Sequence, residues 1–137
     1  MQYPVKLTPD GKYLMVGFPD VPEAHTQGTG KKDALRHALD ALETALSFYI
    51  EEGKPLPTPS KPRRNQPVVE LPASFSAKVL LLYEVNAQNI RPAMLAKKLK
   101  FTPKAISRLL NPYRRSSIDH IQSALKVLGK TLEIRAI

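Results

Sequence analysis

Six of the chain's 13 prolines fall between Lys54 and Pro72, in the stretch KPLPTPSKPRRNQPVVELP. Proline has a fixed φ and no amide hydrogen, so this stretch has no helical periodicity and no room for a paired central strand. We therefore expect a domain boundary here, formed by an extended, semi-rigid linker over residues 54–72 that lets its neighbours reorient. A proline-rich ligand for an SH3-like partner is the alternative.

The formal charge of +9 is unevenly distributed between the two sides of this stretch. Residues 1–53 hold five Lys/Arg and eight Asp/Glu, a net charge of −3, whereas residues 54–137 hold sixteen and four, a net charge of +12. A charge run is often only a solvated face, but this asymmetry indicates two different partners. The basic part suits a polyanion such as nucleic acid, and the acidic part suits a basic protein.

The segment before the linker is predicted to form a small β-sheet covered by one helix. Tyr3–Thr8 alternates apolar and polar residues, Tyr13–Phe18 is expected as a second strand after the turn Pro9-Asp10-Gly11, and Ala24–Gln27 can add a short third strand. Leucines and alanines at helical spacing then predict a long amphipathic helix over 31–52, which Thr29 or Gly30 would cap and Gly53 would end. We assign residues 1–53 to this first domain.

The segment after the linker, residues 73–137, is predicted to be helical. Helical periodicity indicates helices over 73–87, 92–100, 103–111 and 117–128, joined by short loops. Residues 130–137 alternate apolar and polar side chains, which predicts a final strand. The expected fold class is therefore α+β, with a small N-terminal sheet and an all-helical C-terminal domain that ends in a strand.

Residues 91–110, RPAMLAKKLKFTPKAISRLL, have the spacing of a helix-turn-helix. Ala96 is small enough for a second helix to approach, Ile106 packs that helix back, and Thr102-Pro103 supplies an N-cap and an N1 proline. Lys100 stands where such motifs usually carry a turn glycine. The residues expected to face the major groove are Lys104, Ala105, Ser107 and Arg108, with Arg108 the candidate for guanine. Thr102 at the helix start is a further DNA-binding candidate. The residues expected to contact phosphates are Lys97, Lys98, Lys100, Arg114 and Arg115.

No catalytic or metal site emerges from the sequence. There is no cysteine, the three histidines are scattered, and no glycine-rich phosphate loop or Ser/His/Asp arrangement is present. Asp40 and Glu43 lie three residues apart but lack a third ligand. We expect no enzyme and no cofactor. With no apolar run of transmembrane length and no signal peptide, we expect a cytoplasmic protein without a membrane partner.

The order of parts resembles the HicB antitoxins that carry a helix-turn-helix. The likeness rests on FPDVPEAHTQG, the long helix, KVLLLYEVNAQ, LAKKLKFTPKAISRLLN and LGKTLEI, and it spans nearly the whole chain. It implies a partial RNase-H-like N-terminal domain without catalysis, a HicA-type mRNA-cleaving toxin as partner, and repression of the operon through operator DNA. The chain departs from the pattern at Gly30-Lys31-Lys32, where relatives are usually acidic.

A toxin that binds RNA presents a basic surface, which an acidic domain can cover by mimicking the charge of the substrate. The candidate toxin-binding residues are Asp20, Glu23, Asp33, Asp40 and Glu43. The alternative is a stand-alone helix-turn-helix repressor whose N-terminal domain senses a ligand or dimerises.

A single recognition helix contacts too few base pairs for useful specificity, so we expect a homodimer or higher oligomer with half-sites about 34 Å apart. An isolated tail strand would leave its main-chain groups unpaired, and pairing with the tail of a second copy would satisfy them. The candidate dimerisation residues are Ile121, Leu125, Leu128, Leu132 and Ile134.

Overall fold

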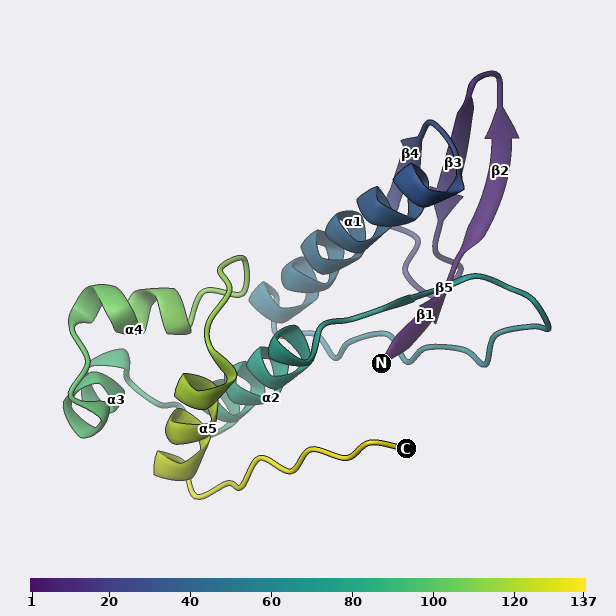
Figure 1. Ribbon diagram of the computed structural model, residues 1–137. Coiled ribbons are helices and arrows are strands. Elements are labelled where there is room, and N and C mark those ends of the chain that lie inside the picture. Colours follow the sequence, from purple (N-terminus) through teal and green to yellow (C-terminus); the bar gives the residue numbers. More distant parts are fainter. The chain divides into compact units, whose positions relative to one another are not determined.

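The computed structural model describes residues 1–137, and the chain folds as two units, residues 1–71 and 72–137, here named the N-terminal and C-terminal units. The N-terminal unit contains two small antiparallel sheets and one long helix, and the C-terminal unit contains four helices (Figure 1). The predicted α+β class is therefore confirmed.

The predicted hairpin forms from β2 (Lys6–Asp10) and β3 (Tyr13–Gly17). Asp10 faces Tyr13 across a two-residue turn in which Gly11 has a φ of 60°, a value that suits glycine. The predicted third strand is β4 (His25–Gly28), which pairs antiparallel with β3 at the other edge. Val16 on the central strand β3 is almost fully buried.

The segment predicted as one strand over 3–8 is split, because β1 (Gln2–Pro4) leaves the hairpin and pairs with β5 (Val68–Glu70). Val5 continues this pairing by donating its amide hydrogen to the oxygen of Pro67 at 2.9 Å. Strand β5 lies within 54–72, the stretch predicted to have no room for a paired central strand, and it pairs on one side only, with β1. The three residues Val68, Val69 and Glu70 carry no proline, and a strand this short needs only one partner.

The rest of the predicted linker also lies on the N-terminal unit. The buried Tyr3 donates its hydroxyl hydrogen to Pro57 O at 2.7 Å, and the carboxylate of Asp20 accepts from the amide of Ser60 at 2.8 Å. Residues 54–71 are therefore part of the first unit, whose last residue is Leu71 and not Gly53. The proline content predicted an extended segment, but it gave no sign of these contacts.

Helix α1 (Lys31–Glu51) packs along β3 and β4 with a face of small and apolar side chains, among them Ala34, Ala38 and Leu42 (Figure 1). A Cβ on Gly28 would lie 2.4 Å from the main-chain nitrogen of Ala34, so only glycine permits this close approach. Gly30 is the N-cap and has a φ of 115°, another conformation that favours glycine.

The C-terminal unit consists of α2 (Ala73–Ala87), α3 (Pro92–Leu99), α4 (Pro103–Leu109) and α5 (Ile118–Val127). All four predicted helices are confirmed, with ends that differ from the predicted ends by two residues or fewer. Their apolar faces meet in one core around Leu81, Leu95, Ile106 and Leu125.

The C-terminal tail forms no strand in the single chain, contrary to the prediction for 130–137. It is extended but has no neighbouring strand to supply hydrogen bonds (Figure 1). Ile121, Leu125 and Leu128 belong to the core of the unit and are at most 8% exposed, so these three are unavailable as a dimer surface. Leu132 packs partly against that core, and Ile134 is 69% exposed.

Candidate functional site

A tight turn over residues 100–102 joins α3 to α4. Lys100 has φ 57° and ψ 39°, the left-handed conformation that glycine adopts most easily. The lysine therefore occupies the position where such motifs usually carry a turn glycine, with the same backbone conformation. The turn closes with the amide of Phe101 donating to Ala96 O at 2.9 Å. Three other helices end on a left-handed residue at Gly53, Asn89 and Gly129, residue types that tolerate it better.

Helix α4 starts as its sequence predicts. Thr102 Oγ1 accepts from the amide of Ala105 at 3.1 Å, and Pro103 occupies the first turn, where its missing amide hydrogen is not needed. This bond occupies the hydroxyl oxygen of Thr102, so its main role in the free protein is that of a cap. Ala105 is half-buried, whereas Lys104, Ser107 and Arg108 are exposed on the outer face of α4.

The C-terminal unit concentrates positive charge around these helices. It contains twelve Lys/Arg and three Asp/Glu, while the N-terminal unit contains nine of each. Two of the three acids lie beside basic groups of their own, Glu84 near Lys130 and Glu133 near Arg135. Lys97, Lys98, Lys104 and Arg108 make no ion pair. The exposed phosphate-contact candidates are Lys97, Lys98, Lys100, Arg114 and Arg115.

Lys78 on α2 is a functional candidate that the sequence reasoning missed. Its side chain is 3% exposed, and its ammonium group donates to the main-chain oxygens of Arg108, Asn111 and Arg114 and to Ser116 Oγ. These acceptors belong to the C-terminal end of α4 and the loop after it, where the helix dipole favours a cation. The available signal was a lone lysine inside the apolar run of α2.

Burial lowers the pKa of Lys78 to about 8, because an ammonium group loses hydration inside the core. The four oxygen acceptors act in the opposite direction, since they favour the charged form. Lys78 therefore holds the segment that carries Arg108, Arg114 and Arg115 through its protonated side chain.

The N-terminal unit has a groove of about 420 Å³ between β4 and α1. Two of the predicted toxin-binding residues, Glu23 and Asp40, line it together with His25, His37 and Phe48. Phe48 is 54% exposed, which is unusual for a large aromatic side chain. Asp40 has no ion pair or side-chain hydrogen bond and is exposed. The groove therefore combines an apolar ring with carboxylates that can reach a partner. We name it the acidic groove.

Glu23 is oriented by α1, because the hydroxyl of Tyr49 donates to its carboxylate at 2.9 and 3.0 Å. This hydrogen bond raises the pKa of Tyr49, since removing the phenolic proton beside a carboxylate is unfavourable. Helical spacing alone gave no sign of this contact.

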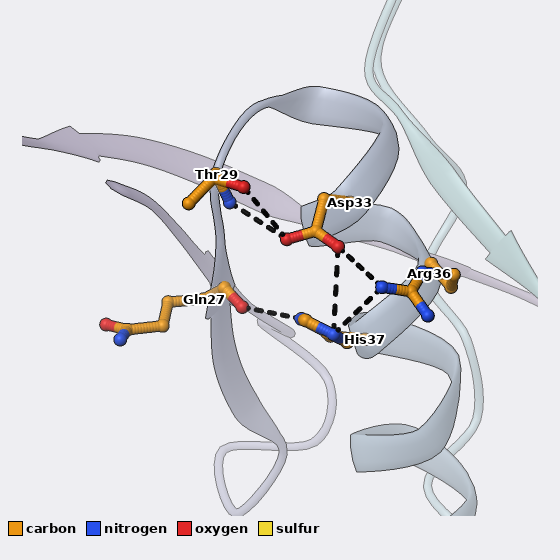
Figure 2. A network of polar contacts seen from close by, with 5 residues as sticks. All are labelled: Gln27, Thr29, Asp33, Arg36 and His37. Carbon is orange, nitrogen blue, oxygen red and sulfur yellow. Dashed lines mark hydrogen bonds and ion pairs between the residues drawn. The ribbon is translucent and has the colours of Figure 1, made fainter. Parts of the chain in front are cut away.

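Asp33 lies at the start of α1 in a polar network with Thr29, Arg36 and His37 (Figure 2). Its carboxylate accepts from the amide of Thr29 at 3.0 Å and from Arg36 Nη2 at 2.7 Å. The hydrogen bond from Arg36 is the largest cause that lowers the pKa of Asp33 to about 2, and the bond from Thr29 adds to it. Asp33 therefore stabilises the helix start.

His37 extends this network to β4. Its Nδ1 lies 2.9 Å from Gln27 O (Figure 2), and since a carbonyl oxygen can only accept, Nδ1 carries the hydrogen. Nε2 lies 3.4 Å from Arg36 Nη2 and 3.8 Å from Asp33 Oδ1. The hydrogen bond to Gln27 O thus orients the histidine that lines the acidic groove.

The five predicted toxin-binding acids have different surroundings. Glu23 and Asp40 share the acidic groove, and Asp33 lies in the network at the start of α1. Asp20 is bonded to Ser60, and Glu43 is half-buried on α1 and does not line the groove.

No group of three or more His, Asp or Glu side chains is arranged to hold a metal ion. None of the helices combines the length and apolar character needed to cross a bilayer.

Comparison with known proteins gives consistent matches. Residues 2–80 match the family model described as the HicB-like antitoxin of bacterial toxin–antitoxin systems. The chain is 44% identical over 137 residues to antitoxin HicB 2 of Photorhabdus laumondii. The alignment covers the whole chain and 97% of that protein. It is 41% identical over 136 residues to antitoxin HicB of Escherichia coli K12, covering 98% of each, and 29% identical over 132 residues to antitoxin HicB of Pseudomonas fluorescens, covering 96% and 90%.

Proposed function

This chain belongs to the HicB-like antitoxin family of bacterial toxin–antitoxin systems, and we propose that its N-terminal unit neutralises a HicA-type mRNA-cleaving toxin while its C-terminal unit represses the operon by binding operator DNA. The observation that carries the proposal is the segregation of charge. The C-terminal unit holds twelve Lys/Arg against three Asp/Glu, and the N-terminal unit is balanced at nine of each. One chain thus offers two surfaces of different chemistry.

The operator-binding surface is the outer face of α4 with the basic residues around it. Arg108 is exposed and makes no ion pair, and Lys78 holds its main-chain oxygen, so the backbone that carries this side chain has a defined position. Bidentate contacts from arginine to guanine provide sequence discrimination, whereas lysines such as Lys97 and Lys98 add affinity through phosphates. Lys104 and Ser107 complete the face that would enter the major groove.

The toxin-binding surface is the acidic groove. A toxin that cleaves RNA needs a basic active-site surface, and the carboxylates of Glu23 and Asp40 complement it. Phe48 supplies an exposed aromatic anchor of the kind that dominates binding energy at protein interfaces. The HicA-type toxin would therefore bury Phe48 and contact the two carboxylates at the rim.

The C-terminal tail is the proposed dimer contact. It has no strand partner within the chain, and Ile134 is exposed, so pairing with the tail of a second copy would satisfy main-chain groups and cover Ile134. Truncation after Gly129 should then give a chain that neutralises the toxin but binds a palindromic operator weakly. Light scattering and gel-shift titration test this, and a truncated chain that remains dimeric on the operator would overturn it.

The two surfaces can be separated by mutation. Phe48→Asp should abolish rescue of growth when the toxin is co-expressed but leave operator binding unchanged. Arg108→Ala should do the reverse, with a loss of about 1–3 kcal/mol on the operator and little change on random DNA. If either variant impaired both activities equally while remaining folded by circular dichroism, the assignment of two surfaces would be wrong.

A further inference from the structure

A second concentration of positive charge lies in the N-terminal unit, away from the acidic groove. Lys6, Lys61, Arg63 and Arg64 line a hollow of about 580 Å³, here named the basic hollow. All four residues are exposed and none makes an ion pair. The one carboxylate that lines the hollow is Asp20. Four unpaired cations around one hollow give it a positive potential that attracts anions.

The loop that carries three of these cations is fixed at both ends. At its start, Ser60 donates its amide and hydroxyl hydrogens to the carboxylate of Asp20. At its end, Gln66 accepts from the amide of Arg63 at 2.9 Å and donates to Val5 O at 3.4 Å. The charges are therefore presented by an ordered loop, so less conformational entropy is lost when they bind a ligand.

We propose that the basic hollow binds phosphate groups of duplex DNA, as a second contact that adds to the α4 surface. Arginine and lysine are the residues that contact phosphates, and the bonds from Ser60 hold the only carboxylate of the hollow. No side chain lining the hollow is aromatic, so it lacks the stacking platform that binders of single strands use. This inference rests on the proposed function, because operator binding by the C-terminal unit brings the chain to DNA.

The test measures binding of the full chain to a random-sequence duplex of 20 base pairs as a function of salt. In the hollow variant, Lys61, Arg63 and Arg64 are each changed to Gln. Each phosphate contact contributes about 0.9 to the salt slope, so the slope should fall by about 2 to 3, with a roughly 100-fold loss of affinity at 0.1 M salt. A control variant with Lys12, Lys31 and Lys32 changed to Gln removes the same charge from the same unit outside the hollow.

Asp20→Asn tests the hollow in the opposite direction. The asparagine oxygen can still accept from the amide of Ser60, and the loss of the negative charge makes the hollow more positive. Affinity for the random duplex should therefore increase several-fold. Because this variant gains binding, a loss of folding cannot explain the expected result.

The outcomes separate this inference from the proposed function. An unchanged slope for the hollow variant, or an equal loss in hollow and control variants, overturns the basic hollow as a DNA contact. So does a loss confined to single-stranded RNA of the same length, which would assign the hollow to a different partner. Operator repression is tested apart from this, by whether the unaltered chain prefers its operator over the random duplex.

Discussion

The ammonium nitrogen of Lys78 lies 2.7 Å from the main-chain oxygen of Arg114, which ties α2 to the basic loop that follows α4. The same nitrogen lies 3.2 Å from the main-chain oxygen of Arg108. One buried side chain thus holds the segment between two residues assigned to DNA. Helix α2 was predicted from its helical periodicity, and the structure adds that Lys78 on it holds the main chain beside the proposed recognition surface.

Replacing Lys78 by Met should lower the free energy of unfolding of the C-terminal unit by about 1–3 kcal/mol, because buried carbonyl oxygens lose their donor. Specific operator binding should weaken more than binding to random DNA, since the position of Arg108 becomes less defined. Urea denaturation and gel-shift titration measure the two effects. Lys126→Met on the exposed face of α5 is the matched control. Equal stability of both variants would show that the four bonds contribute nothing.

The start of α1 should depend on pH through Asp33. The pKa of this carboxyl is about 2 in the folded chain and 3.8 in the unfolded chain, so the stabilisation is complete above pH 3.8 and is lost as the pH falls through 2. Thermal unfolding of the chain between pH 5 and 2 checks this, with Asp33→Asn as the reference. The difference in melting temperature between the two proteins should shrink with acid. A difference that stays constant over this range would contradict the assignment.

Gly28→Ala should destabilise the N-terminal unit by about 1–3 kcal/mol, because the added methyl group would meet the main chain of Ala34 and force α1 away from β4. Gly17→Ala on β3 is the control, since its methyl group would meet nothing within 4 Å. Thermal unfolding of the two variants decides the matter. Similar melting temperatures would mean that α1 can shift without cost.

These contacts mark the limit of what the sequence could predict. The start of α4 was predicted correctly because Thr102 and Pro103 act within one turn. The pairing of Gln2 with Glu70 was missed, because it depends on residues 68 positions apart and on the path of a proline-rich segment. Ile121 was assigned to a dimer surface, because helical spacing is the same for a face that packs inward and a face that meets a partner.

In the candidate site, too, the features set by neighbouring residues were predicted, and those set by contacts between distant residues were not. The spacing that suggested a helix-turn-helix was local, and the left-handed turn at Lys100 lies where a glycine was expected. The sequence identifies the acidic residues of the N-terminal unit, but it does not show which of them lie together in the fold. Only the folded chain shows that Asp40 lines a groove with Phe48, whereas Asp20 is bonded to Ser60.

Lys100→Gly should separate the backbone role of this residue from its charge. A left-handed non-glycine residue costs roughly 1–2 kcal/mol, partly offset by the larger entropy of glycine in the unfolded chain, so the variant should be more stable by about 0.5–1 kcal/mol. Its salt slope on DNA should fall by about 0.9 if Lys100 contacts a phosphate. Lys98→Gly loses the same charge inside α3 and should be less stable by about 1 kcal/mol. A destabilised Lys100→Gly variant would contradict this account.

The smallest fragment that neutralises the toxin should be residues 1–71 and not residues 1–54. The shorter fragment contains the acidic groove, but it lacks β5, so β1 loses its only strand partner and the buried hydroxyl of Tyr3 loses its acceptor at Pro57. Removing residues 55–71 also removes the buried Val69 and Leu71 and uncovers Tyr3. Each buried apolar side chain of this size contributes about 1.5–3 kcal/mol, a large share of the stability of so small a unit. Circular dichroism should therefore show cooperative unfolding for 1–71 and none for 1–54, and only 1–71 should restore growth when the toxin is expressed.

Tyr3→Phe in the longer fragment is the intermediate case. This variant should fold with a lower melting temperature and still neutralise the toxin, because Tyr3 lies outside the acidic groove. A well-folded, neutralising fragment 1–54 would show that the proline-rich segment is a linker after all.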